Sequence, residues 1–190
     1  MVIIGDVHNK TGLYNGIVRD LKEKTIQVGD FGFERSHRWH MANVDPNQHK
    51  VLFGNHDYYP LLHERNSLGD FMFQDGIMTI RGAFSVDKDA RNNGFDWFEE
   101  EQLDEEKCNE AEDTFSTLKP SVVITHDCPT EVFNYMSGRP DKTQTRQMLQ
   151  VCFTHHQPDV WVFGHHHRSW SMILNGTKFI CLAELETFHL

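Results

Sequence analysis

The stretch Lys50-Val51-Leu52-Phe53-Gly54-Asn55-His56-Asp57 joins a short apolar run directly to side chains that can bind a metal ion. A run this short, rich in Val and Phe and closed by Gly, predicts a buried β-strand rather than a helix. The pattern occurs four more times: Val2–Ile4 before Gly5-Asp6-Val7-His8, Thr25–Val28 before Gly29-Asp30, Val122–Ile124 before Thr125-His126-Asp127, and Val160–Phe163 before Gly164-His165-His166-His167.

Helical patterns lie between these runs. They are predicted over 13–24, over the acidic stretch 99–118, and over 143–156, whose apolar side is formed by Met148, Leu149, Val151 and Cys152. Strands that alternate with helices predict an α/β fold. Because ligands bind beyond the carboxyl ends of the strands in such sheets, we expect the five polar clusters to meet in one place.

Two segments predict β-hairpins. Phe71–Phe73 and Ile77–Phe84 flank the turn Gln74-Asp75-Gly76, and 169–174 and 177–182 flank the turn Asn175-Gly176. No repeat, linker or low-complexity segment interrupts the chain, so residues 1–190 are predicted to form a single domain.

Composition narrows the class of protein. The formal net charge is −10, which disfavours a general nucleic-acid binder because such proteins carry a basic face. No apolar stretch approaches the roughly 18 residues of a membrane span, and the N-terminus resembles no signal peptide. The four cysteines are scattered and form no CxxC pair, which predicts reduced thiols and a cytoplasmic protein. The 13 histidines are the feature to explain.

The polar clusters supply a mixed set of carboxylate, imidazole and amide ligands. Such a set suits divalent ions such as Mn²⁺, Fe²⁺ or Zn²⁺. Asp6 and His8, like His165 and His167, are two residues apart, and in extended backbone this spacing places both on one side, with Val7 and His166 turned away. The candidates outnumber the ligands of one tetrahedral ion, so two ions sharing a carboxylate are expected. They are Asp6, His8, Asp30, Asn55, His56, His126, His165 and His167.

The ordered motifs Asp6-x-His8, Gly29-Asp30, Gly54-Asn55-His56-Asp57, His126 and Gly164-His165-x-His167 resemble the calcineurin-like metallophosphoesterase superfamily. The segment Arg81–Lys88, followed by Arg91 and Trp97, resembles a stretch found in its small bacterial and phage-type members. The resemblance implies a four-layer α/β/β/α sandwich with a binuclear metal centre. It implies that Asp6, His8 and His167 bind one ion, that Asn55, His126 and His165 bind the other, and that Asp30 bridges them. It further implies that His56 is the general acid and that Asp57 orients it.

The function implied is hydrolysis of phosphomonoesters or small phosphodiesters by attack of a metal-bound water or hydroxide, with Mn²⁺ the first expectation and Fe, Zn, Ni or Mg the alternatives. The substrate would be a small-molecule or peptide phosphoester. Arg81, Lys88 and Arg91 are the cationic candidates for holding a phosphate oxygen. The oligomeric state stays open.

Three alternatives remain at this stage. A nuclease-type phosphodiesterase is disfavoured by the acidic charge. A protein phosphatase is disfavoured because the second motif continues as Phe31-Gly32-Phe33-Glu34-Arg35, whereas in that branch it continues with an Asp-Arg-Gly segment, and because Asp57 stands where that branch has Glu. A non-catalytic interaction module would be expected to have lost ligands, whereas every motif position here holds a metal-competent residue.

The remaining histidines match no motif and are expected on the surface: His37, His40, His49, His63, His155, His156 and His189. The acidic run from Glu99 to Asp113 is expected to be a solvated helix face.

Overall fold

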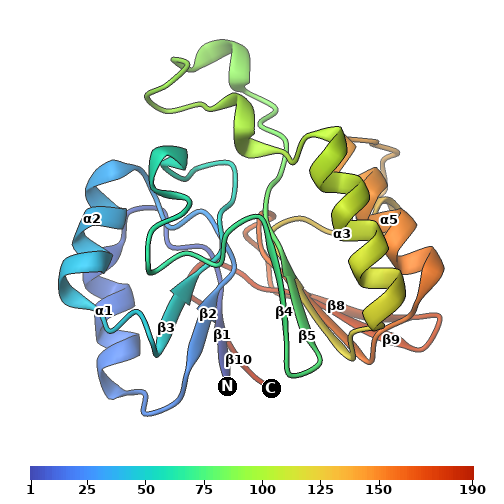
Figure 1. Cartoon of the computed structure of the whole chain (residues 1–190), viewed down its shortest axis with the longest axis horizontal. Helices are drawn as coiled ribbons and strands as arrows, with labels where there is room; N and C mark the ends of the chain where they lie inside the picture. Colours follow the sequence, from blue (N-terminus) through green and yellow to red (C-terminus); the bar gives the residue numbers. More distant parts are fainter.

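Two β-sheets lie face to face at the centre of the molecule in the computed structural model, which describes all 190 residues (Figure 1). The smaller sheet has the order β10-β1-β2-β3, with β1 (Val2–Ile4), β2 (Thr25–Gln27) and β3 (His49–Val51) parallel to one another. The short C-terminal strand β10 (Thr187–His189) pairs antiparallel with β1.

The larger sheet has six strands in the order β4-β5-β6-β7-β9-β8. Its inner strands β5 (Ile77–Ile80), β6 (Val122–Thr125), β7 (Val160–Phe163) and β9 (Thr177–Cys181) are parallel. The edge strands β4 (Phe71–Gln74) and β8 (Trp170–Leu174) belong to the two predicted hairpins and pair antiparallel with β5 and β9.

Helices cover the outer face of each sheet. The helices α1 (Thr11–Asp20) and α2 (Glu34–Asn43) flank the smaller sheet, and α3 (Glu105–Leu118), α4 (Thr130–Ser137) and α5 (Gln144–His155) belong to the larger one (Figure 1). Three single 3₁₀ turns complete the elements: η1 (Tyr59–Leu61), η2 (Lys88–Ala90) and η3 (Glu99–Glu101). No helix is long and apolar enough to cross a membrane.

The alternation of side chains along the strands creates the four layers. In β1, Val2 and Ile4 pack toward α1 and α2, whereas Ile3 packs between the sheets. In β7, Trp161 packs toward the helices of the larger sheet, whereas Val162 packs between the sheets. Because successive side chains point to opposite faces, strands that are apolar throughout can be covered on both sides. This confirms the α/β/β/α sandwich.

Element boundaries differ from the sequence prediction where polar groups cap the chain. The helix α3 begins only at Glu105, since the Asp104 carboxylate accepts a hydrogen bond from the Lys107 amide and caps it there. The preceding acidic residues form the separate turn η3. The helices α2 and α4 and the strand β10 were not predicted. The buried side of α2 carries Ser36, His37 and His40, so no apolar period marks it.

The apolar face of α5 is rotated relative to the prediction. Val151 is 38% exposed, and Phe153 takes its place in the core at 1% exposure, where its ring lies 5.1 Å from that of Phe179. The spacing of Met148, Leu149, Cys152 and Phe153 is that of one helical face.

We predict that Phe153→Ala lowers the free energy of unfolding by about 3–5 kcal/mol, because it leaves a cavity between α5 and the larger sheet. The matched variant Val151→Ala, two residues away on the same helix, should change the free energy of unfolding by no more than about 0.5 kcal/mol. Urea unfolding followed by circular dichroism measures both. Equal losses in the two variants would contradict the assigned helix face.

Candidate metal centre

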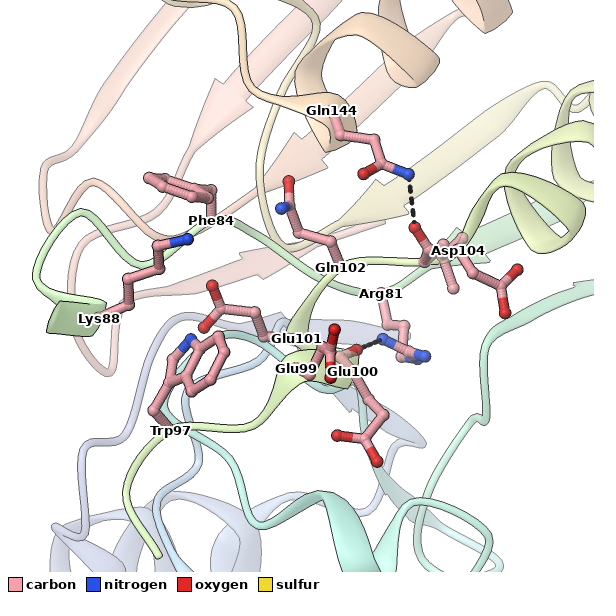
Figure 2. Close-up of a pocket in the computed structure, with 11 residues that line it drawn as sticks. Arg81, Phe84, Lys88, Trp97, Glu99, Glu100, Glu101, Gln102, Asp104 and Gln144 are labelled. Atoms are coloured by element: carbon pink, nitrogen blue, oxygen red, sulfur yellow. Dashed lines mark hydrogen bonds between the residues drawn. The ribbon is translucent and has the colours of Figure 1, made fainter. Parts of the chain in front are cut away.

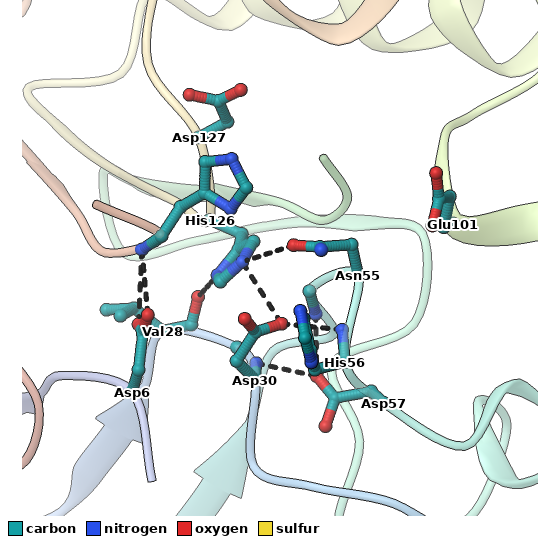
Figure 3. A network of polar contacts seen from close by, with 12 residues as sticks. Asp6, Val28, Asp30, Asn55, His56, Asp57, Glu101, His126 and Asp127 are labelled. Carbon is teal, nitrogen blue, oxygen red and sulfur yellow. Dashed lines mark hydrogen bonds and ion pairs between the residues drawn. The ribbon is translucent and has the colours of Figure 1, made fainter. Parts of the chain in front are cut away.

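The loops that follow β1, β2, β3, β6 and β7 meet at one end of the sandwich, as the sequence predicts (Figure 3). Two groups of ligand atoms lie there, each with all its members within 4.8 Å of one another. The first group is Asp6, His8, Asp30 and His167, and the second is Asp30, His126 and His165. Asn55 adjoins the second group, with its Oδ1 3.3 Å from His126 Nε2.

Asp30 belongs to both groups and uses a different oxygen for each. Its Oδ2 lies 3.6 Å from His8 Nε2, and its Oδ1 lies 3.2 Å from His126 Nε2. The Oδ1 atom also accepts a hydrogen bond of 2.7 Å from the His56 amide, which fixes the carboxylate. A single buried carboxylate therefore faces two separate sets of ligands, which is the arrangement required of a bridging ligand.

The donor set fits divalent cations. His126 Nδ1 lies 2.9 Å from the Val28 carbonyl oxygen, which can only accept, so Nδ1 carries the proton and Nε2 is left to face Asp30 and Asn55 (Figure 3). A ligating imidazole is oriented in this way by a hydrogen bond from its other nitrogen. The Nε2 atom, a carboxylate oxygen and an amide oxygen are all acceptors, and a cation is what such a group binds.

The charges of the metal-free chain point the same way. Burial lowers the pKa of His126, but the neighbouring Asp30 carboxylate outweighs burial and raises it to about 10. Burial would raise the pKa of Asp30, but the imidazoles of His126, His56 and His8 hold it well below its usual range. Asp30 is therefore ionised and His126 carries a second proton. A divalent ion would displace that proton, because a ligating histidine must be neutral.

The backbone of the ligand loops is strained. His8, Asp30, His165 and His167 have φ values of 45°, 55°, 66° and 50°, in the left-handed region that non-glycine residues seldom adopt. The expectation of extended backbone at His8 and around His165 and His167 is therefore wrong, although His166 does point away, toward Asp127. Such strain persists only where surrounding contacts hold it, and it concentrates at functional sites.

Two glycines allow this close approach. A Cβ at Gly54 would collide with Asp30 Oδ1 and His126 Nε2, and a Cβ at Gly164 would collide with Asp6 Oδ1. The space beside the ligands is therefore taken by the ligands themselves, which explains why Gly stands directly before Asn55 and directly before His165.

Asp57 ties the ligand loops together. It is fully buried; its Oδ2 accepts from the amides of Asp30 and Gly54 at 2.7 Å each, and its Oδ1 accepts from the Gly32 amide at 3.0 Å. The His37 Nε2 atom lies 2.8 Å from the same Oδ1. All these bonds go to backbone amides and to His37, and none goes to the His56 ring. The carboxylate therefore fixes loops rather than orienting the His56 imidazole.

His37 was among the histidines expected on the surface, and that expectation is wrong for three of the seven. His37 and His40 are fully buried on the inner side of α2, and His49 is 6% exposed beside Thr25. Each finds a polar partner in the core, as a buried imidazole must: His37 contacts Asp57, His40 lies 3.3 Å from the Tyr14 hydroxyl, and His49 lies 2.9 Å from the Thr25 hydroxyl.

We predict that Asp57→Asn destabilises the metal-free protein by about 2–4 kcal/mol, because the amide NH₂ would face N–H donors that need an acceptor. The loss should be the same in a His56→Ala background, since the Asp57 carboxylate makes no contact with the His56 ring and independent effects add. Urea unfolding of the four proteins gives the comparison. If Asp57→Asn lowered turnover with unchanged stability, and only when His56 was present, Asp57 would instead act through His56.

Of the three cationic candidates, the structure brings only Arg91 to the ligand cluster. Its Nη2 lies 2.5 Å from His56 Nε2, its Nη1 donates to the Asn55 carbonyl oxygen at 3.4 Å, and Asp87 holds the guanidinium at 2.8 Å. Arg81 is buried in an ion pair of 2.7 Å with Asp70 and also donates to the Glu100 carbonyl oxygen. Its guanidinium is thus occupied within the fold.

Lys88 lines a cavity of about 550 Å³, together with Arg81, Phe84, Trp97, residues 99–104 and Gln144 (Figure 2). Its Nζ is 5.3 Å from the Phe84 ring centroid and 6.0 Å from the Trp97 ring centroid. None of the predicted metal ligands lines this cavity. One wall is Glu101, whose buried carboxylate binds Ser85, and Ser85 in turn contacts Asn55. Ser85 and Glu101 are residues at the site that the motifs did not reveal.

A third cluster of possible ligands, Asp127, Cys128 and His166, lies behind the second group. Asp127 is fully buried, and Arg146 Nε lies 2.8 Å from its Oδ2. The guanidinium already supplies the positive charge that this carboxylate needs, so the cluster does not resemble a cation site.

The fold and the site together define an α/β/β/α sandwich that carries a cluster of candidate ligands for divalent metal ions. A family model of the calcineurin-like phosphoesterase superfamily domain matches residues 1–184, and the chain belongs to this superfamily. The superfamily is one of hydrolytic phosphoesterases. No curated protein matches the chain.

Solved structures share the fold at low sequence identity. The phosphopantetheinyl hydrolase PptH from Mycobacterium tuberculosis is 12% identical, with a TM-score of 0.59 over 96% of this chain and 89% of that one. A putative 5'-nucleotidase from Staphylococcus aureus is 13% identical, with a TM-score of 0.52 over 96% of this chain and 48% of that one. At such identities these likenesses concern the fold alone.

Proposed function

We propose that this protein hydrolyses phosphomonoesters or small phosphodiesters at a binuclear centre. Asp6, His8 and His167 would hold one divalent ion, and Asn55, His126 and His165 the other, with Asp30 between them. The observation that carries the proposal is that the two oxygens of Asp30 face two separate ligand groups, 3.6 Å from His8 Nε2 and 3.2 Å from His126 Nε2. When bound, two such ions neutralise phosphoryl charge and activate water.

His56 would protonate the leaving oxygen. Its amide is fixed on Asp30 and its ring lies 5.2 Å from that of His8, so the imidazole stands at the edge of the first ligand group. Burial and the Arg91 guanidinium lower the pKa of His56, and the Asp30 carboxylate opposes them. A lowered pKa makes the imidazolium a stronger acid and also lowers the fraction of His56 that is protonated at neutral pH, so the proposed proton transfer to an alkoxide leaving group uses the protonated fraction.

Arg91 would bind a phosphoryl oxygen. Its guanidinium contacts His56 Nε2 in the substrate-free chain, so an anionic oxygen placed beside His56 would compete for the same N–H groups. An ion pair between the guanidinium and an anionic oxygen is stronger than the guanidinium contact with an uncharged imidazole nitrogen that it would replace. Binding of substrate by Arg91 would also release His56 Nε2 for its own task.

The acidic charge of −10 continues to favour a small-molecule or peptide phosphoester over a nucleic acid. Within the metal-loaded site the charge balance differs, because two dications outweigh the carboxylates of Asp6 and Asp30. A phosphoester is therefore attracted to the centre although the protein as a whole is anionic.

We predict that the protein loaded with Mn²⁺ hydrolyses p-nitrophenyl phosphate and that His56→Ala lowers kcat about 10²- to 10⁴-fold on a substrate with a poor leaving group. The loss should be smaller on p-nitrophenyl phosphate, whose leaving group needs little protonation. Metal content measured by atomic emission should stay at two ions per chain. Full activity of His56→Ala on the poor leaving group would exclude the acid role.

The same assay with bis(p-nitrophenyl) phosphate separates the candidate activities. Faster turnover of the diester would favour a phosphodiesterase. No hydrolysis of either compound with Mn²⁺ or Ni²⁺ supplied would favour a non-catalytic interaction module and contradict the proposed function.

We further predict that Arg91→Gln raises KM for p-nitrophenyl phosphate, and the inhibition constant of inorganic phosphate, by about 10- to 100-fold, the value of one lost charge-assisted hydrogen bond. The control is Lys88→Gln, which removes a cation from the same segment but not from the ligand cluster, and which should leave the phosphate inhibition constant unchanged. Equal effects of both variants would argue for a general electrostatic attraction instead.

A further inference from the structure

Glu101 is a buried carboxylate whose hydrogen bonds end on one residue. It is 2% exposed, its Oε1 accepts from the Ser85 amide at 2.7 Å, and its Oε2 accepts from the Ser85 hydroxyl at 2.6 Å. Ser85 itself is fully buried. The Ser85 hydroxyl donates the second bond, because an ionised carboxylate can only accept. Burial raises the pKa of Glu101, and the two hydrogen bonds from Ser85 oppose that rise by stabilising the ionised form.

The hydrogen bond from Ser85 to Glu101 determines which end of the Asn55 amide can face the Ser85 hydroxyl. Asn55 Nδ2 lies 3.1 Å from Ser85 Oγ. A hydroxyl has one proton, and the Ser85 proton is used on Glu101, so Ser85 Oγ can only accept from the amide. The NH₂ end of Asn55 must therefore face Ser85. The Oδ1 end then faces the opposite side, where His126 Nε2 lies 3.3 Å away (Figure 3).

We propose that Glu101 is a positioning residue that, through Ser85, sets the orientation of the Asn55 amide so that its oxygen and not its NH₂ group faces the second metal ion. This inference rests on the proposed function, since it assumes an ion held by Asn55, His126 and His165. It assigns a task to a residue 46 positions along the chain from the ligand that it controls.

The surrounding contacts keep Glu101 in place. Its backbone carbonyl oxygen accepts from the Ala83 amide at 3.1 Å and from the Tyr59 hydroxyl at 3.2 Å. The neighbouring Glu100 carbonyl oxygen accepts from the buried Arg81 guanidinium at 2.5 Å. The turn η3 is thus held by Arg81 and Ala83, which follow β5, and by Tyr59 of η1. Arg81 therefore has a structural role, because it helps to fix the turn that carries Glu101.

A carboxylate is required for this task, whereas an amide of the same shape would fail. The NH₂ group of a glutamine at 101 can donate to Ser85 Oγ, and the Ser85 proton is then free to turn toward Asn55. The Asn55 amide would gain by presenting its oxygen to Ser85. Its NH₂ group would then face the metal ion, which NH₂ cannot ligate.

The test is a titration of the metal-free full chain with Mn²⁺ by calorimetry. Wild type should show two binding steps, and the variant Asn55→Ala identifies the step that depends on Asn55. In Glu101→Gln that step should weaken about 10- to 100-fold, as for other partners of metal ligands, while the other step is unchanged. The matched control is Glu99→Gln, an exposed acid in the same 3₁₀ turn, which should leave both steps unchanged.

A second background separates orientation from general support of the loop. A carboxylate at position 55 has two oxygens and no NH₂ group, so its orientation needs no partner. Glu101→Gln should therefore weaken Mn²⁺ binding much less in Asn55→Asp than in wild type. Ser85→Ala should resemble Glu101→Gln, and the double variant should be no worse than either single one, because the two residues act in series.

The outcomes are distinct. Selective weakening of the Asn55 step, with its rescue in the Asn55→Asp background, supports the inference. An unchanged titration in Glu101→Gln, an equal weakening of both steps, or an equal penalty in the Asn55→Asp background overturns it. Two Mn²⁺ steps without hydrolysis of any phosphoester would refute the proposed activity while leaving the role of Glu101 intact, and a wild type that binds no Mn²⁺ would refute both.

Discussion

The buried carboxylate of Asp57 holds the ligand loops in register, and the geometry of the centre follows from it. Its two oxygens accept from the amides of Asp30, Gly32 and Gly54 and contact His37 on α2. Burying such a charge is costly unless every acceptor site is filled. The loops after β2 and β3 are therefore held against the helix α2. As a result, Asp30 and Asn55 lie in fixed positions at the two groups of ligand atoms.

The ligand cluster is costly for the metal-free fold. Four of the predicted ligands adopt left-handed backbone, and the ionised Asp30 lies among imidazoles, one of which must bind an extra proton. These costs are local, whereas the three apolar clusters that support them extend over both sheets. Conflict between local preference and the overall fold is typical of functional sites, and bound cations would relieve the electrostatic part of it.

The sequence predicted those features in which local pattern and tertiary environment agree. The apolar runs that became β1, β2, β3, β6 and β7, both hairpins, and the convergence of the polar clusters were all predicted, since period and turn chemistry are local. The helix α2 was missed because its core face is made of histidines, which take part in the core only through partners such as Asp57 and Tyr14. The ion pair of Arg81 could not be predicted from the sequence either, because Asp70 comes close to Arg81 only in the folded hairpin.

The segment between β5 and α3 links the proposed phosphate contact to the predicted metal ligands. The loops after the strands supply those ligands. Within the segment, Ser85 contacts the Asn55 side chain, and Arg91 contacts both the Asn55 carbonyl oxygen and the His56 ring. Asn55 and His56 are adjacent in the chain, so the segment between β5 and α3 restrains both the expected metal ligand and the expected acid. Under the proposed function, changes in this segment would alter which phosphoester is accepted without changing the strands. The proposed roles of Asn55 and Arg91 then imply that metal affinity and substrate preference are coupled.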